Sequence, residues 1–242
     1  MSSQNQIEPQ SAKGSMGMTN TLFIIIASTF VIFIIYKYFF GEKTKQKNSI
    51  VIIGPSQSGK TSFFYYLLGK EKTETVVSMQ INEVTNYQAS AFKGKHNYID
   101  IPGQGYFKET ILEKIQEALL IILFVDSTEK NSTVTAAEYL YDILNSDKFN
   151  PEIPIVIACN KQDLNLPKNK KMIENNLATE LENLKKIKQK NHLEEQAEVG
   201  ALFQMKKRFD FQMFKNISFV ETDKNTQFAS LILSCHKVLY PN

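Results

Sequence analysis

Hydrophobic residues first gather in one long stretch near the N-terminus. No charged residue occurs from Gly14 to Tyr36, and residues 22–35 are mostly Leu, Ile, Val and Phe. Because a bilayer span needs about 20 apolar residues, we predict a transmembrane helix over residues 19–40. The alternatives are a cleaved signal peptide and a buried core element. A signal peptide has an apolar region of about 7 to 15 residues, whereas this stretch ends in Tyr36-Lys37-Tyr38-Phe39-Phe40, which suits a membrane interface.

After a linker at residues 41–48, short apolar runs alternate with amphipathic segments. Strands are predicted at residues 49–53, 97–101, 119–125, 153–159 and 217–220, and helices at residues 62–68, 133–145 and 227–240. Such alternation is typical of an α/β fold with a mostly parallel central sheet and helices on both faces. We therefore predict one domain over residues 49–242, with a flexible tail at residues 1–18.

Residues 166–207 interrupt this alternation. They are rich in Lys, Glu and Asn, and we predict a solvated helix over residues 170–189 followed by a surface insertion. A docking site for a partner is the alternative interpretation.

Composition and charge limit the classes of function. The chain has 242 residues, and its net charge of +3 is too small to indicate a nucleic-acid-binding protein. Its two cysteines, Cys159 and Cys235, do not form a disulfide framework and suit a reducing compartment. Lysines are more numerous after the apolar stretch than before it, which predicts a cytosolic location for the domain.

A P-loop pattern follows the first predicted strand and opens the first predicted helix. Its glycines allow backbone amides to surround phosphate oxygens at the helix N-terminus. Lys60 is expected to reach the β- and γ-phosphates, and the Thr61 hydroxyl to hold Mg²⁺. The predicted phosphate-binding residues are Gly54, Pro55, Ser56, Gln57, Ser58, Gly59, Lys60, Thr61 and Ser62.

The sequence Asn160-Lys161-Gln162-Asp163 stands at the end of another predicted strand. Ligands of open α/β sheets bind at such carboxyl ends. An Asp163 carboxylate can accept hydrogen bonds from both N1–H and the exocyclic amine of guanine, a donor pair that adenine lacks. Lys161 can lie along the base, and Asn160 can tie this loop to the P-loop. The pattern therefore predicts GTP or GDP as ligand, with Mg²⁺.

Between these motifs lies Asp100-Ile101-Pro102-Gly103-Gln104, also at a strand end. Asp100 is expected to hold Mg²⁺ through water and the Gly103 amide to contact the γ-phosphate. Gln104 is the candidate catalytic residue, because its side chain could orient the attacking water.

Two further loops complete the predicted site. Thr75 is the expected Mg²⁺ ligand of a first switch loop, with Thr73 and Ser78 as competing candidates. After the last strand, the loop that holds Thr222 and Lys224 is expected at the base, where a backbone amide would contact the guanine carbonyl and Lys224 would shape the loop.

In this order, the motifs resemble the Ras superfamily over residues 50–239, and within its Arf-like branch they are similar to the beta subunits of the signal recognition particle receptor. The order of the apolar stretch and the P-loop supports that resemblance, as does the Lys-rich insertion before Phe209. The matching motifs lie at residues 100–103, 124–127, 137–144, 158–163 and 209–211.

This resemblance implies a single-pass protein of the endoplasmic reticulum membrane. In its GTP-bound form it would hold the receptor's alpha subunit and help to deliver ribosome–nascent chain complexes to the translocon. Gln104 stands where these proteins often have His, and Glu221-Thr222-Asp223-Lys224 replaces a more usual Ser-Ala-Lys. These departures leave the hydrolysis rate and the last base contact open.

Three other functions remain. An Arf- or Rab-type trafficking GTPase would use a lipid anchor, whereas the sequence begins Met1-Ser2 rather than Met-Gly and ends Tyr240-Pro241-Asn242 without a prenylatable Cys. A receptor subunit could use GTP as a structural switch with little or only partner-stimulated turnover. A P-loop kinase or ATPase is disfavoured by Asp163.

Overall fold

The computed structural model describes residues 26–32, 47–70, 79–192 and 208–241. They belong to two compact units, Met1–Lys45 and Gln46–Asn242. In the first unit, residues 26–32 form an exposed helix, and the rest of the predicted membrane span at residues 19–40 lies outside the described residues, as does the predicted tail. In the part of the chain that the structure describes, no helix has the length and apolar character needed to cross a membrane.

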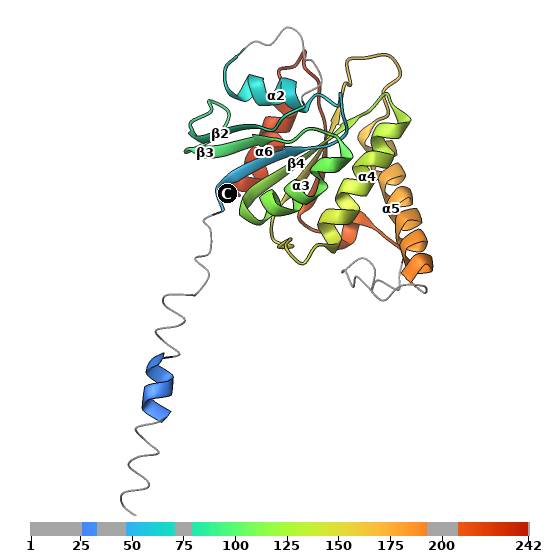
Figure 1. The fold of residues 1–242 in the computed structure, drawn as a ribbon. Coiled ribbons are helices and arrows are strands. Elements are labelled where there is room, and N and C mark those ends of the chain that lie inside the picture. Colours follow the sequence, from blue (N-terminus) through green and yellow to red (C-terminus); the bar gives the residue numbers. More distant parts are fainter. Residues whose placement is uncertain (1–25, 33–46, 71–78, 193–207, 242) are drawn as a thin grey trace, which may run out of the picture. The chain divides into compact units, whose positions relative to one another are not determined.

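The second unit is built on a six-stranded sheet with the order β2-β3-β1-β4-β5-β6 (Figure 1). The strands are β1 Ser49–Ile53, β2 Asn82–Tyr87, β3 His96–Asp100, β4 Ala118–Asp126, β5 Ile155–Asn160 and β6 Ile217–Glu221. All neighbours pair in parallel except β2, which is antiparallel to β3. The predicted mostly parallel α/β fold is therefore confirmed.

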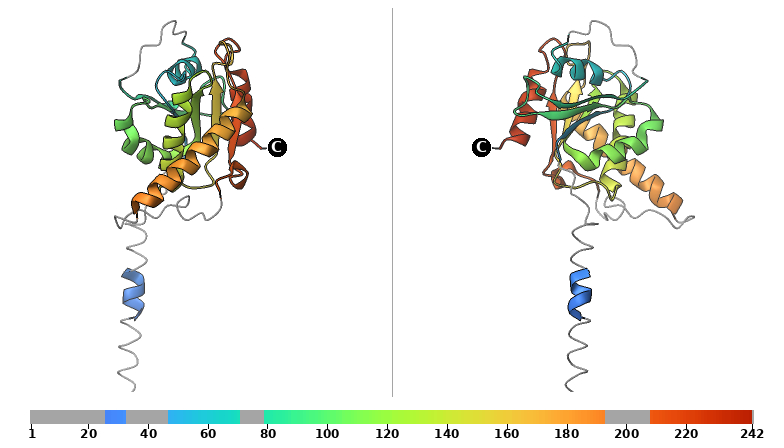
Figure 2. Two further views of the ribbon diagram at one scale, coloured as in Figure 1. Left: turned by 90° about the vertical axis from the view of Figure 1, so that its right-hand side faces the viewer. Right: turned by 60° about the vertical axis from the view of Figure 1, so that its left-hand side comes forward.

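Helices cover both faces of this sheet (Figure 2). They are α2 Lys60–Leu67, α3 Lys108–Lys114, α4 Lys130–Asn145, α5 Lys170–His192 and α6 Ala229–Leu239, with short 3₁₀ turns at Gly105–Phe107, Ile115–Glu117 and Phe211–Met213. Alternate side chains of β4 enter two different cores: Ile121 and Leu123 pack with α4 and α5, whereas Leu120 and Ile122 pack with α2 and α6. A strand buried on both faces explains the unbroken apolar run in the sequence.

Two elements were not predicted from the sequence, the strand β2 and the helix α3. Strand β2 lies at the edge of the sheet and reads Asn-Glu-Val-Thr-Asn-Tyr, with side chains that are only partly buried or exposed. Because an edge strand buries little surface, its sequence lacks a strong apolar pattern.

Helix α5 corrects the prediction of a solvated helix in the insertion. Ile173, Leu177 and Leu181 are buried along one face, in the core that also contains Phe209 and Phe211. The backbone amide of Phe209 donates to Glu182 Oε2 at 3.0 Å. Helix α5 and the segment that begins at Phe209 are therefore part of the core, and residues 193–207 between them lie outside the described part.

Candidate nucleotide site

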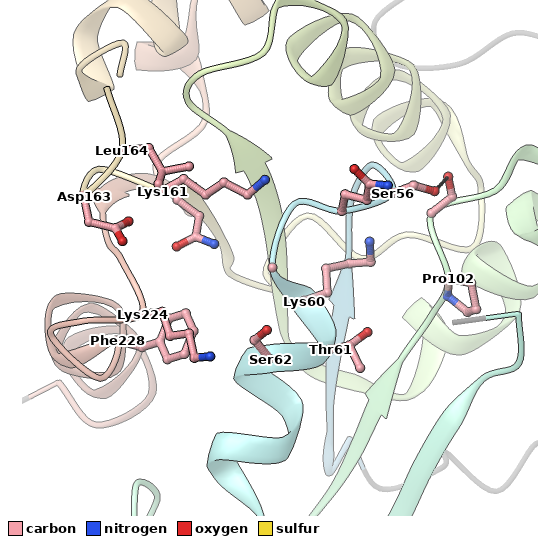
Figure 3. Close-up of a pocket in the computed structure, with 14 residues that line it drawn as sticks. Ser56, Lys60, Thr61, Ser62, Pro102, Lys161, Asp163, Leu164, Lys224 and Phe228 are labelled. Carbon is pink, nitrogen blue, oxygen red and sulfur yellow. Dashed lines mark hydrogen bonds between the residues drawn. The ribbon is translucent and has the colours of Figure 1, made fainter. Parts of the chain in front are cut away.

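A cavity of about 410 Å³ lies at the carboxyl edge of the sheet (Figure 3). It brings together the P-loop, the loops after β3 and β5, and the loop before α6. The predicted residues that line it are Ser56, Gln57, Gly59, Lys60, Thr61, Ser62, Gly103, Asn160, Lys161, Asp163 and Lys224. Pro102, Leu164 and Phe228 also line it and were not predicted. The site thus joins motifs that are about 100 residues apart in the sequence.

Gly59 and Asn160 connect the P-loop to the loop after β5. Gly59 has φ +102°, and a Cβ atom at this position would lie 2.1 Å from the Asn160 side-chain nitrogen. The Asn160 amide donates to the Ser58 carbonyl at 2.8 Å. Only glycine leaves space for this bond, so Asn160 ties the two loops together as the sequence predicts.

The phosphate end of the cavity is formed by the first turn of α2. Amides in a first helical turn have no partner within the helix and favour an anion. Lys60 is 5% exposed, and its Nζ donates to the Pro55 carbonyl at 2.6 Å. Burial lowers the pKa of Lys60 to about 8, against the opposing attraction of Asp100. A bound phosphate would provide the counter-charge that favours the protonated amine.

Thr61 and Asp100 form the candidate Mg²⁺ position. The Thr61 hydroxyl donates to Asp100 Oδ2 at 2.8 Å, and Asp100 is fully buried at the end of β3. The Asn82 amide donates to the same oxygen at 3.0 Å. Within the described residues there is no group of three or more His, Cys, Asp or Glu that could hold a metal. One hydroxyl and one carboxylate still fit Mg²⁺ at a nucleotide, because phosphates and water complete its octahedral coordination.

The loop after β3 touches the P-loop at Gly103. A Cβ atom at Gly103 would lie 2.3 Å from the Ser56 backbone nitrogen, and the Ser56 hydroxyl donates to the Gly103 carbonyl at 3.1 Å. Gln104 does not line the cavity, and its side chain accepts a hydrogen bond from the exposed Tyr106 hydroxyl. Thr75, Thr73 and Ser78 lie outside the described residues.

Lys161 is positioned by an acid that the sequence analysis did not assign to the site. Its Nζ contacts Asp126 Oδ2 at 2.6 Å. Burial raises the pKa of Asp126, but hydrogen bonds from Lys161 and Thr128 outweigh this effect and hold the pKa below its usual value. The sequence could have indicated Asp126, because this residue ends strand β4, whose carboxyl end lies at the edge of the sheet that holds the cavity.

Around Asp163, the loop before α6 differs from the prediction. The Thr222 amide donates to the Cys159 carbonyl at 3.0 Å, and the residue is buried and does not line the cavity. This bond uses the Thr222 amide within the fold, so a base contact from this loop would come from another backbone amide and stays a prediction. Asn225, which was not predicted, donates its amide to Asp163 Oδ2 at 3.0 Å.

The sequence model of the family "Signal recognition particle receptor beta subunit" matches residues 45–218. The beta subunit from Saccharomyces cerevisiae is 30% identical over 179 residues, which cover 68% of this chain and 72% of that protein. The beta subunit from Dictyostelium discoideum is 32% identical over 152 residues, covering 61% and 51%. The match thus spans about half of the Dictyostelium protein and 61% of the one from Rattus norvegicus.

Solved structures have the same fold. A structure of the mammalian signal recognition particle receptor matches with a TM-score of 0.63 and 24% identity, covering 78% of this chain and 99% of that one. An SRb-GTP/SRX complex from Chaetomium thermophilum matches with a TM-score of 0.54 and 21% identity, covering 74% and 90%. The family match extends over most of the chain and includes the P-loop and the loop after β5. This chain therefore belongs to the family of signal recognition particle receptor beta subunits.

Proposed function

We propose that this chain is a membrane-anchored GTP-binding subunit of a signal recognition particle receptor. The observation that carries this proposal is one cavity lined by Lys60 at one end and by Asp163 at the other. GTP has a triphosphate at one end and a guanine base at the other. A site for GTP therefore needs a cation at one end and a base-recognising carboxylate at the other. The proposed membrane is that of the endoplasmic reticulum, with residues 19–40 as the anchor and the domain in the cytosol.

Each end of the cavity has a distinct role in this proposal. The α2 amides and Lys60 bind the β- and γ-phosphates, and Thr61 and Asp100 hold Mg²⁺, which would neutralise phosphate charge there. Asp163 accepts from the guanine N1–H and exocyclic amine, and Asn225 orients it. Adenine offers no such donor pair, so ATP would leave the Asp163 carboxylate without these bonds.

The proposed partner is the receptor's alpha subunit, bound in the GTP state. Support comes from the related Chaetomium thermophilum complex, whose description names SRX together with SRb-GTP. Gly103 packs against the P-loop backbone, so a γ-phosphate at the P-loop can change the position of this loop. Such ordering of a loop by the γ-phosphate creates or removes a partner surface. Delivery of ribosome–nascent chain complexes to the translocon follows from this role.

Slow or partner-stimulated hydrolysis fits the position of Gln104. Its side chain accepts a hydrogen bond from Tyr106 and does not line the cavity. Orientation of an attacking water by Gln104 therefore requires the loop to move. GTP would then act mainly as a structural switch.

The testing experiment uses residues 46–242, which form a compact unit with both hydrophobic cores. This unit is loaded with GDP or with a non-hydrolysable GTP analogue and incubated with purified alpha subunit. The expected result is capture only in the GTP-analogue state. In a nucleotide-binding assay, GTP but not ATP should displace the bound analogue. Equal capture in both states would contradict the switch, and binding of ATP with equal affinity would contradict the guanine site.

A further inference from the structure

Positive charge gathers at the edge of the sheet that lies opposite the nucleotide cavity. Because β1, β3, β4, β5 and β6 are parallel, the segments before these strands all meet at this edge. Exposed lysines precede four of the strands: Lys47 before β1, Lys95 before β3, Lys148 before β5 and Lys215 before β6. We call this side of the domain the basic edge.

Helix α5 adds more positive charge to the basic edge. It follows β5 and therefore runs back from the cavity edge, so that its last turns reach the opposite side. Lys186, Lys188 and Lys190 are exposed in these turns. Exposed acids also precede the strands, at Glu113, Asp147, Glu152 and Asp210, but they are fewer than the seven lysines. The chain as a whole carries only +3, whereas exposed lysines outnumber exposed acids on this side of the domain.

Apolar and aromatic residues on the basic edge distinguish between two kinds of anionic partner. Ile187, between Lys186 and Lys188, is 56% exposed, and Met213 is 47% exposed. Surfaces that bind single-stranded nucleic acid stack bases on aromatic side chains. The exposed large aromatic residues of the described domain are Tyr66 and Tyr106, and neither belongs to the basic edge. Basic residues beside exposed aliphatic ones are instead typical of surfaces that lie on anionic membranes.

We infer that the basic edge binds the acidic phospholipid headgroups of a membrane surface, with Lys188, Lys190 and Lys215 as principal contacts. Juxtamembrane lysines are attracted to anionic lipid, each by up to about fivefold in affinity, and the attraction declines with salt. The proposed anchor would add to this attraction, because it would tether the domain to the same bilayer. The lipid contact would hold the nucleotide cavity on the side that faces the cytosol. Only this orientation rests on the proposed function.

The test measures binding of residues 46–242 to vesicles, without the proposed anchor. Vesicles of phosphatidylcholine alone are compared with vesicles that contain about 30% phosphatidylserine, an anionic lipid, at low and high salt. The test variant is Lys188→Gln/Lys190→Gln/Lys215→Gln. The matched control, Lys130→Gln/Lys170→Gln/Lys171→Gln, removes three exposed lysines from the first turns of α4 and α5, near the cavity edge.

We expect binding only to the vesicles with phosphatidylserine, weakened at least tenfold in the test variant and unchanged in the control. Equal binding to both kinds of vesicle, or equal loss in both variants, would overturn the inference. Binding of duplex RNA through the same lysines, without vesicle binding, would make the basic edge a nucleic-acid surface instead. GDP affinity, measured on the same proteins, reports the proposed nucleotide function separately and shows that each variant is folded.

Discussion

The Asn225 side-chain amide donates a hydrogen bond to Asp163 Oδ2 at 3.0 Å. It joins the loop after β5 to the loop before α6, across 62 positions of the sequence. Asp163 is exposed, so without this bond its carboxylate could rotate freely in solvent. In the proposed site, Asn225 is therefore a positioning residue for the group that recognises guanine.

Replacing Asn225 by Ala should weaken GDP binding by about threefold to tenfold, because a net hydrogen bond contributes about 1 kcal/mol. The preference for GDP over inosine diphosphate, which lacks the exocyclic amine, should decrease as well. Both affinities can be measured by calorimetry. Asn165→Ala, an exposed change in the same loop, is the control and should leave the preference intact. An unchanged preference in Asn225→Ala would show that Asn225 has no role at the base.

Lys60 predicts a pH dependence of phosphate binding. Its pKa in the free protein is about 8, and an anionic phosphate would raise this value. Below pH 8 the amine is already protonated, so affinity should not change with pH. Above pH 8 binding must take up a proton, and the affinity for GDP should fall by up to about tenfold per pH unit.

Calorimetry in two buffers with different ionisation enthalpies measures this proton directly. Uptake should approach one proton at pH 9 and zero at pH 6.5. The Lys60→Arg variant stays charged throughout this range and should show less uptake at pH 9. If wild type and variant take up protons equally, Lys60 is not the titrating group.

The ion pair of Lys161 and Asp126 should contribute to acid-sensitive stability. The pKa of Asp126 is lower in the folded protein than its usual value, so its contribution is present above about pH 4, the unfolded value. It is lost as the pH falls from there toward the folded pKa. Asp126→Asn should lower the free energy of unfolding at pH 7 by about 1–2 kcal/mol.

Urea unfolding of Asp126→Asn and wild type at pH 7 and pH 3.5 measures this contribution. The difference between the two proteins should be smaller at pH 3.5. Asp147→Asn, which changes an exposed acid far from the cavity, should have little effect at either pH. A constant difference for Asp126→Asn at both pH values would exclude the titration of Asp126 as the cause.

Much of the fold could be predicted from the sequence because its central strands are buried on both faces. Strand β4 has eight buried residues of nine. In a domain of this size, few structures other than a buried strand accommodate such an apolar run. The polar edge strand β2 and the short helix α3 lack that signal. Within the site, the P-loop and Asp163 follow from local motifs. The contacts of Asn225 and Asp126, and the Thr222 amide bond to Cys159, depend on how distant loops meet, which no local pattern encodes.

Gly103 supplies the last prediction. Its missing Cβ leaves room for the Ser56 backbone nitrogen, which would lie 2.3 Å from that atom, and the Pro55 carbonyl carbon would lie 2.4 Å away. Backbone atoms cannot rotate aside like a flexible side chain, so Gly103→Ala must move one loop away from the other. We expect Gly103→Ala to lower the free energy of unfolding by about 1–3 kcal/mol. Compared with wild type, the variant should lose more affinity for a GTP analogue than for GDP, because the γ-phosphate would lie at this contact. Ser56→Ala removes only the hydrogen bond to the Gly103 carbonyl and is the matched control, with a smaller effect on stability. Fluorescent nucleotide titrations and thermal unfolding measure both effects. An equal decrease for GDP and the GTP analogue in Gly103→Ala would show that the contact supports the P-loop as a whole and does not sense the γ-phosphate.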